Sequence, residues 1–236
     1  MYLLETLPDS IINIVKLYVI FIPKTNEELK SAVDLWCKNK KQAHKFYGHI
    51  SLWNTQNITN MSELFCYDED FNSVISSWDV SNVVNMMYMF YTSKSFNQPL
   101  NNWNVSKVKD MRYMFANAES FNYPLNNWNV SSVKFMNSMF HHSLSFNQAL
   151  NKWNVSNVKN MMLMFTEAKL FNQLLDDWNI RNDTIIKYIF DETSLKIFPK
   201  WYTDERAEKS MIRYWLFRSE YEPSPGILVS SNNEDY

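Results

Sequence analysis

The sequence contains almost no glycine, since Gly48 and Gly226 are the only two among its 236 residues. A glycine-rich loop that cradles phosphate is therefore excluded. Cysteine is equally scarce, and Cys37 and Cys66 cannot build a disulfide framework. We expect both to be free thiols of a reducing compartment. These two shortages exclude phosphate-loop enzymes and disulfide-stapled small domains.

No sign of charge dominates. The formal net charge is −2 and the isoelectric point is near 6.1, so no general attraction to nucleic acid or to an anionic membrane is expected. The apolar stretch IINIVKLYVIFI (11–22) contains Lys16 and is much shorter than the roughly 20 apolar residues that a membrane-spanning helix needs. The opening MYLLETLPDS has no basic region and no small-residue cleavage site. These features predict an intracellular or virion-associated protein without a signal peptide or a membrane span.

What the sequence does contain is a repeat of 25 residues. FNQPLNNWNVSKVKDMRYMF (96–115) returns as FNYPLNNWNVSSVKFMNSMF (121–140). The tryptophans of the repeat are Trp53, Trp78, Trp103, Trp128, Trp153 and Trp178. Phenylalanines recur every 25 residues from Phe65 to Phe190, and methionines recur at the same interval from Met61 to Met161. A fixed period of this length predicts an array of stacked units, because one unit cannot bury its own apolar residues.

Each repeat reads as a strand, a turn and a helix. In NVSKVKDMRYMFANA (104–118), Ser106 suits a helix N-cap, and Val108, Met111, Phe115 and Ala118 fall on one helical face. SFNYPL (120–125) alternates like a short strand, and NNWNV suits a turn. The predicted fold class is α/β, a leucine-rich-repeat-like solenoid of about six coils with helical caps at both ends. Asparagines at 72, 97, 122, 147 and 172 are expected to form a hydrogen-bonded ladder between coils.

The two ends depart from the repeat and predict caps. Residues 26–48 predict one helix with Leu29, Val33 and Trp36 on one face. Residues 203–221 predict an amphipathic helix that Thr203 or Asp204 caps. Its apolar stripe consists of Met211, Ile212, Trp215 and Leu216. The predicted organisation is a helical segment at 1–25, a capping helix at 26–50, the solenoid at 51–190, a C-terminal cap at 191–221 and a polar tail at 222–236.

The repeat unit resembles that of the DUF285 or BspA-like leucine-rich-repeat surface-protein family, which has repeats of about 25 residues. The segment AVDLWCKNKKQAHKFYGHISLWNTQNITNMSELF (32–65) resembles the lead-in of that family, and the resemblance covers residues 26–202. Such repeats occur in mycoplasma and oral-bacterial surface proteins, in some protists and in large DNA viruses. The resemblance implies a solenoid that displays a surface for protein contact, carries no catalytic residues and, in the surface members, lies at the cell surface. The large-DNA-virus branch is one source that the resemblance allows.

Three functional interpretations remain open. The first is a non-enzymatic scaffold for protein–protein interaction. The second is an F-box-like substrate adaptor of a ubiquitin ligase, because LPDSIINIVKLYV (7–19) looks like the opening of an F-box, with Trp36 at a suitable later distance. The third is a structural or surface component of a virion or cell envelope. An enzyme is not expected, because no nucleophile, base and orienting group stand out together.

No metal or cofactor is expected. The spacing of Cys37, His44 and His49 matches no standard zinc pattern, and a fourth ligand is missing. His141 and His142 are more simply read as surface residues of a variable position. Asn-x-Ser/Thr sequons begin at Asn57, Asn60, Asn104, Asn129, Asn154 and Asn182. We interpret them as a by-product of the repeat's turn rather than as glycosylation sites.

Candidate binding residues are those that change from coil to coil inside a constant frame, because packing fixes only the interior. A mixture of tyrosine, arginine and histidine at such positions is typical of a protein-binding face, although an ordinary solvated surface would also vary. The predicted protein-binding residues are Tyr88, Gln98, Arg112, Tyr113, Tyr123, Phe135, His141, Gln148 and Gln173. The predicted partner is a protein of unknown identity and not a nucleic acid, and the sequence indicates no particular oligomeric state.

Overall fold

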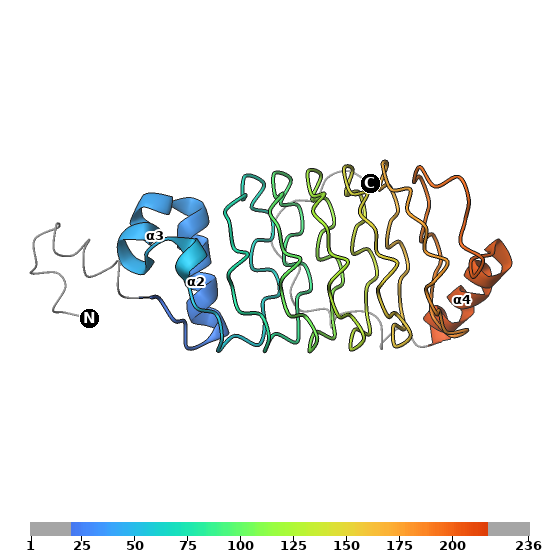
Figure 1. The fold of residues 1–236 in the computed structure, drawn as a ribbon, viewed down its shortest axis with the longest axis horizontal. Coiled ribbons are helices and arrows are strands. Elements are labelled where there is room, and N and C mark those ends of the chain that lie inside the picture. Colours follow the sequence, from blue (N-terminus) through green and yellow to red (C-terminus); the bar gives the residue numbers. More distant parts are fainter. Residues whose placement is uncertain (1–19, 217–236) are drawn as a thin grey trace, which may run out of the picture.

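The computed structural model of the protein describes residues 20–216, with the backbone alone for residues 213–216. Within that range the chain forms a row of coils between two helical ends (Figure 1). Helices α2 (Asn26–Lys38) and α3 (Lys40–Tyr47) and the 3-10 helix η1 (Ile50–Leu52) precede the coils, and α4 (Asp204–Leu216) follows them. The F-box-like segment 7–19 and the polar tail 222–236 lie outside the described residues.

The predicted α/β class is wrong, because the coils of the described chain contain neither helices nor a sheet. Helix accounts for 17% and strand for 3% of the structure, and all of the helix lies at the two ends. The expected helix at 104–118 is a series of tight turns, and SFNYPL (120–125) is not a strand. Among residues 20–216, strand pairing is limited to isolated parallel bridges that run from Asn60–Asn85 through to Asn160–Ile185. This is not a solenoid of strand–helix coils.

The segments around these bridges hold the coils together through their backbones. We call residues 60–67, 85–92, 110–117, 135–142, 160–167 and 185–192 the ladder segments. In 85–92, every second backbone N–H donates to a carbonyl of the next coil, at 2.8–3.0 Å. The donors are Met86, Tyr88, Phe90 and Thr92, and the acceptors are Asp110, Arg112, Met114 and Ala116. A helix would have used these N–H groups internally and left none for the neighbouring coil.

The remaining N–H groups of a ladder segment close tight turns within their own coil. Met89 donates to Met86 at 3.2 Å and Tyr91 donates to Tyr88 at 3.1 Å. This zigzag requires two residues per segment in the left-handed region, although none of them is glycine. Their φ angles are +53° to +64°, and they are Glu63, Tyr67, Tyr88, Thr92, Tyr113, Asn117, Ser138, His142, Leu163, Glu167, Tyr188 and Glu192. Because left-handed backbone costs a non-glycine residue about 1–2 kcal/mol, the bonds between coils must offset that cost.

The interior is a set of aligned aromatic columns. Phe65, Phe90, Phe115 and Phe140 stack on one another at centroid distances of 5.3–5.6 Å. From Trp103 to Trp178, the tryptophan of each coil is buried and donates its indole N–H to a carbonyl of the preceding coil, as Trp128 does to Leu100 at 2.9 Å. The four residues predicted for a helical face, Val108, Met111, Phe115 and Ala118, are all fully buried. Their spacing therefore arises because a series of turns, and not a helix, directs these side chains into the interior.

A second set of segments is held together by side chains. The asparagine segments are residues 71–73, 96–98, 121–123, 146–148 and 171–173. The Asn72 side-chain oxygen accepts the backbone N–H of Asn97 at 3.0 Å. The Asn122 side-chain oxygen likewise accepts the backbone N–H of Asn147 at 2.9 Å. The equivalent bonds Asn122–Asn97 and Asn172–Asn147 continue the series. The predicted asparagine ladder is confirmed.

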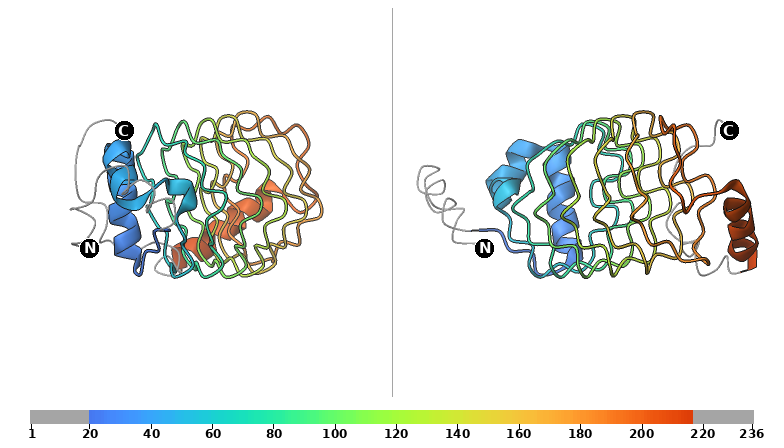
Figure 2. Two further views of the ribbon diagram at one scale, coloured as in Figure 1. Left: turned by 60° about the vertical axis from the view of Figure 1, so that its left-hand side comes forward. Right: turned by 45° about the vertical axis from the view of Figure 1, so that its right-hand side comes forward.

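The N-terminal helices stand in place of a preceding coil (Figures 1 and 2). The Asn26 side-chain oxygen accepts the backbone N–H groups of Thr59 and Asn60, both at 3.2 Å. The buried Trp36 donates its indole N–H to Ser73 at 3.0 Å. The single helix expected over 26–48 is divided at Asn39, whose side chain caps the second helix by accepting the Gln42 N–H at 3.0 Å.

Helix α4 closes the other end and lies across the last coil (Figure 2). The Thr203 hydroxyl accepts the Arg206 N–H at 3.1 Å, as expected for a cap. The face turned to the coils carries Ala207 and Ser210, and the Ser210 hydroxyl accepts the Ile186 N–H at 3.2 Å. Ile212, expected on the apolar stripe, is exposed, because the buried stripe of α4 follows Ala207 and Ser210. The side chains of Trp215 and Leu216 lie outside the described part.

Candidate functional site

The predicted binding residues fall into two groups that occupy two different stretches of the coils. Tyr88, Arg112, Tyr113, Phe135 and His141 lie in ladder segments. Gln98, Tyr123, Gln148 and Gln173 lie in asparagine segments. The structure brings the first group together on neighbouring coils, whereas the second group follows the asparagine ladder.

The three glutamines hold the asparagine ladder in place. The Gln98 amide donates to the Asn72 side-chain oxygen at 2.9 Å, and Gln148 and Gln173 make the same bond to the preceding asparagines at 2.9 and 2.8 Å. A side chain that is bonded to its own scaffold is less free to bind a partner. Tyr123 replaces glutamine in this series and is 38% exposed.

Four tyrosines contact one another on three successive ladder segments, and we call Tyr67, Tyr88, Tyr91 and Tyr113 the tyrosine cluster. Tyr88 and Tyr113 stack with ring centroids 4.7 Å apart and 10° between the ring planes. Tyr91 meets both Tyr67 and Tyr88 edge to face at 5.3 Å. Tyr67 is 61% exposed, and the other three rings are half-buried. The result is an aromatic surface built on a backbone that the ladder bonds fix.

The hydroxyl groups of Tyr67 and Tyr88 stay protonated at neutral pH. Burial raises the pKa of Tyr88 above its usual value, and the neighbouring Tyr113 and Tyr91 raise it further. Burial also raises the pKa of Tyr67, whose hydroxyl is hydrogen-bonded to Tyr91. Neutral phenols both donate and accept hydrogen bonds, so the cluster presents ring faces together with polar edges.

Arg112 lies beside the tyrosine cluster but is not presented to solvent. Its guanidinium forms an ion pair with Asp110 at 2.5 Å and lies over the Phe135 ring, 5.2 Å from its centroid. Only 9% of Arg112 is exposed. The Asp110 carboxylate and the Phe135 ring therefore hold this arginine in the scaffold, which differs from the outward position expected of it.

His141 and His142 lie one coil further along. The Nδ1 atom of His142 is 3.0 Å from the Glu167 carboxylate, and the hydrogen bond to His142 lowers the pKa of Glu167. His141 is half-buried, and its buried Nδ1 atom has no hydrogen-bond partner among residues 20–216. Burial lowers the pKa of His141, so the neutral ring is favoured. Both histidines belong to the contact between two coils.

Neither the cysteines nor the histidines form a reactive or metal-binding group in the described residues. Burial raises the pKa of Cys66 to about 12 and raises that of Cys37 further, so both thiols are protonated and unreactive at neutral pH. His44 and His49 meet edge to face, with ring centroids 6.2 Å apart. Residues 20–216 contain no group of three or more His, Cys, Asp or Glu side chains that could hold a metal ion.

Most sequon asparagines have a structural task. The Asn104 side-chain oxygen accepts the Ser106 N–H at 3.2 Å, so Ser106 belongs to an asparagine-stabilised turn and caps no helix. Asn129 and Asn154 bind the N–H and the hydroxyl of Ser131 and Ser156 in the same way. The recurring Asn-x-Ser therefore reflects the turn that follows each tryptophan.

Sequence reasoning missed two members of the tyrosine cluster and one apolar patch. Tyr67 and Tyr91 occupy positions that vary between coils, so the same rule of variation would have found them. The apolar patch consists of four residues that are 50–76% exposed: Leu170, Leu174, Ile197 and Phe198. Two hydrogen bonds, Ser194 to Lys169 and Lys200 to Asp176, bring its two stretches of chain alongside each other. One signal in the sequence is Leu170, which stands where the three preceding coils have Ser95, Ser120 and Ser145.

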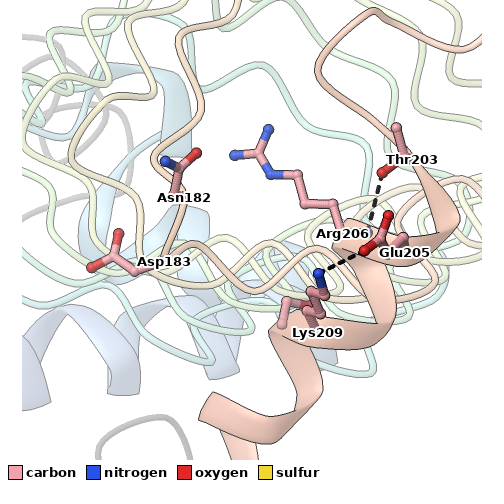
Figure 3. Close-up of a pocket in the computed structure, with 7 residues that line it drawn as sticks. Asn182, Asp183, Thr203, Glu205, Arg206 and Lys209 are labelled. Atoms are coloured by element: carbon pink, nitrogen blue, oxygen red, sulfur yellow. Dashed lines mark hydrogen bonds and ion pairs between the residues drawn. The ribbon is translucent and has the colours of Figure 1, made fainter.

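A polar cavity of about 460 Å³ lies between the last coil and α4. Figure 3 shows the Arg206 guanidinium pointing from α4 toward the segment that carries Asn182 and Asp183. Arg206 donates to the carbonyls of Trp201, Ile180 and Arg181 at 2.7–3.0 Å. Lys209 is paired with Glu205 at 2.6 Å. Because its cations are already bonded, we interpret this cavity as the joint between the cap and the coils.

The fold defines a class of protein in which 25-residue coils stack in one row and expose variable side chains on a constant frame. The profile of the family described as "Mycoplasma protein of unknown function, DUF285" matches residues 36–134 and 108–201, which together cover 166 of the 236 residues. The chain belongs to this family. No curated protein and no solved structure matches the chain. Among residues 20–216, no helix has the length and apolar character needed to cross a membrane. Assignment to the large-DNA-virus branch stays a prediction.

Proposed function

We propose that the protein is a non-enzymatic scaffold that binds another protein through the exposed surface of its coils, with the tyrosine cluster at the centre of the binding surface. The observation that carries this proposal is the contact of four tyrosine rings on three successive ladder segments. Tyrosine is enriched among the residues that dominate binding energy at protein interfaces. It offers a large contact area and loses little side-chain entropy on binding.

The ladder segments support the proposal because they position the rings without using their side chains. The Tyr88 and Tyr113 N–H groups donate to carbonyls of the next coil at 2.9 and 3.1 Å. The Tyr88–Tyr113 stack further limits the motion of both rings. A surface that is ordered before binding loses less free energy when a partner docks.

Quantitative affinity capture from a eukaryotic cell lysate tests this function. The full chain is compared with a Tyr88→Ala/Tyr113→Ala variant and with a Gln98→Ala/Gln148→Ala control, and captured proteins are measured by mass spectrometry. We expect at least one protein to be captured by the full chain and by the control but to be reduced at least tenfold with the tyrosine variant. Circular dichroism and thermal melting establish that both variants are folded.

Two results contradict the proposal. One is equal capture by the tyrosine variant and the full chain. The other is capture of a ubiquitin-ligase adaptor that the tyrosine variant retains and that deletion of residues 1–22 abolishes, which would favour the F-box-like interpretation instead.

A further inference from the structure

We propose that the partner of the tyrosine cluster is a basic peptide segment, whose lysine or arginine side chains lie over the tyrosine rings and beside the carboxylates of the first coil. This inference rests on the function proposed above and specifies the chemistry of the partner. It combines three features of the described residues: the exposed ring of Tyr67 with its half-buried neighbours, a local excess of carboxylates, and cations that already lie over aromatic rings in other coils.

The carboxylates are concentrated at one end of the cluster. Residues 51–75 contain Glu63, Asp68, Glu69 and Asp70 and no lysine or arginine. Tyr67 comes directly before three of these residues, and Glu63 lies close enough to contribute to the raised pKa of Tyr67. Glu63 also precedes Tyr88 by one repeat, and it donates its backbone N–H to Met87 beside that tyrosine at 2.9 Å. A cation at the exposed Tyr67 ring would therefore meet negative charge.

Two of these carboxylates are available to a partner. Glu69 is paired with Lys94 at 3.0 Å, and Asp68 is hydrogen-bonded to the Cys37 thiol. The ion pairs among residues 20–216 include neither Glu63 nor Asp70. Lys30 and Lys38 of α2 act electrostatically on Cys66 and Asp68 without forming an ion pair with Glu63 or Asp70.

The protein itself shows that cations lie over rings on these segments. The Lys187 ammonium is 4.3 Å from the centroid of Tyr188, which occupies the same position in its coil as Tyr88 and Tyr113. The Arg112 guanidinium lies over Phe135 on the ladder segment of the next coil. The ring quadrupole attracts a cation over an aromatic face even when the cation is exposed to solvent. Several such contacts with a carboxylate nearby would select a basic peptide against an acidic or a neutral one.

Fluorescence anisotropy with the full chain tests this inference. The probes are fluorescein-labelled 12-residue peptides that alternate serine with lysine, with glutamate or with proline. We expect the lysine peptide to bind at least tenfold more tightly than the other two at 50 mM salt. We also expect its affinity to fall as salt is raised to 300 mM, because the carboxylates are partly exposed and their attraction is screened.

Matched variants place the peptide on the proposed surface. Tyr67→Ala and Glu63→Gln are each expected to weaken binding of the lysine peptide about three- to fivefold, as loss of a cation–π contact or of a partly exposed charge predicts. Tyr67→Phe keeps the ring face and is expected to bind within twofold of the wild type. Tyr123→Ala, in an asparagine segment, is the control and should leave the affinity unchanged.

Three outcomes overturn the inference. The lysine peptide could bind no better than the glutamate or proline peptide, Tyr123→Ala could weaken it as much as Tyr67→Ala does, or Tyr67→Phe could abolish binding. If any of these holds while the Tyr88→Ala/Tyr113→Ala variant still loses its captured protein, the scaffold function stands and the basic partner is wrong. If the variant captures normally as well, both proposals fail.

Discussion

The ladder segments and the asparagine segments solve the same problem in two ways. Both must satisfy backbone polar groups that face a neighbouring coil. In the ladder segments the backbone does this itself, as when Tyr88 donates to Arg112 at 2.9 Å. In the asparagine segments the Asn122 side chain accepts the Asn147 N–H at 2.9 Å. Where the backbone makes the bond, the side chain is not needed for it.

This difference explains which positions vary. Each described asparagine segment keeps Phe-Asn, from Phe71-Asn72 to Phe171-Asn172, because a side chain without an oxygen at this place would leave an N–H without its acceptor. The ladder position of Tyr88 carries glutamate, tyrosine, serine or leucine in other coils, although its backbone bonds recur from coil to coil. Variation without structural loss is what a recognition surface requires.

The largest effect should follow from breaking the contact that joins the two kinds of segment. Phe115 comes from a ladder segment and stacks on Phe121 of an asparagine segment at 4.2 Å, and both are fully buried. Phe115→Ala removes this contact and leaves a cavity, so it should lower the free energy of unfolding by about 3–5 kcal/mol. Urea unfolding followed by tryptophan fluorescence measures the loss. A loss below about 1.5 kcal/mol would show that the stacked columns contribute little.

A smaller effect should distinguish the two kinds of segment directly. Asn122→Ala removes the acceptor of the Asn147 N–H and of the Gln148 amide. Each of the two bonds contributes about 0.5–1.5 kcal/mol, so we expect the free energy of unfolding measured in urea to fall by about 1–3 kcal/mol. Asn122→Asp keeps the acceptor oxygen, so its free energy of unfolding should fall less than that of Asn122→Ala. Tyr123→Ala changes the neighbouring exposed residue and should lie within about 0.5 kcal/mol of the wild type; equal losses at 122 and 123 would contradict the ladder.

A comparable effect of opposite sign is expected in a ladder segment. Thr92 is β-branched and has a φ of +59°, while Asn117 has a φ of +57° at the same position of the next coil. Asparagine tolerates left-handed backbone better than threonine does. Thr92→Asn should therefore stabilise the protein by about 1 kcal/mol, and Asn117→Thr should destabilise it by a similar amount. Thermal melting measures both, and a loss of stability in Thr92→Asn would contradict the assigned backbone.

The smallest effect should be a pH dependence at the contact between His141 and the next coil. Burial lowers the pKa of His141 below its usual value of 6.5, so the folded state binds fewer protons than the unfolded state does. The stability from this group is complete above pH 6.5 and decreases as the pH falls from 6.5 through the folded pKa. The pKa of Glu167 is also lowered, so the stability that Glu167 contributes is lost only when the pH falls below the usual glutamate pKa of 4.5. The difference between the free energies of unfolding at pH 7.5 and pH 5.5 should be smaller in His141→Gln than in the wild type. An unchanged difference would exclude His141 as its source.

The sequence predicted the period, the buried columns and the asparagine ladder, because each leaves a repeated residue type at a fixed interval. It did not predict the conformation within a coil. Val108, Met111, Phe115 and Ala118 have helical spacing, and a series of turns places the same residues inward. The usual signal for left-handed turns is glycine or asparagine, whereas Tyr88 and Tyr113 occupy these positions here. Sequence alone therefore favoured a helix.

The candidate site was only partly predictable for a related reason. Variation between coils identified Tyr88 and Tyr113, but it also selected Gln98 and Gln148, whose bonds to asparagine side chains are visible only once the coils are stacked. Arg112 was expected to face outward, and its burial depends on Asp110 and on the ring of Phe135 one repeat away.

Site-resolved amide hydrogen exchange in Asn122→Ala and Tyr113→Ala tests the central claim most directly. If side chains satisfy the backbone in asparagine segments and the backbone satisfies itself in ladder segments, the Asn147 amide should exchange about tenfold faster in Asn122→Ala, which corresponds to a loss of about 1.4 kcal/mol. The amides of Tyr88 and residue 113 should keep their wild-type protection in Tyr113→Ala, because their acceptors on Arg112 and Asn137 are backbone carbonyls. Unchanged protection at Asn147, or loss of protection at Tyr88 and residue 113, would contradict the account.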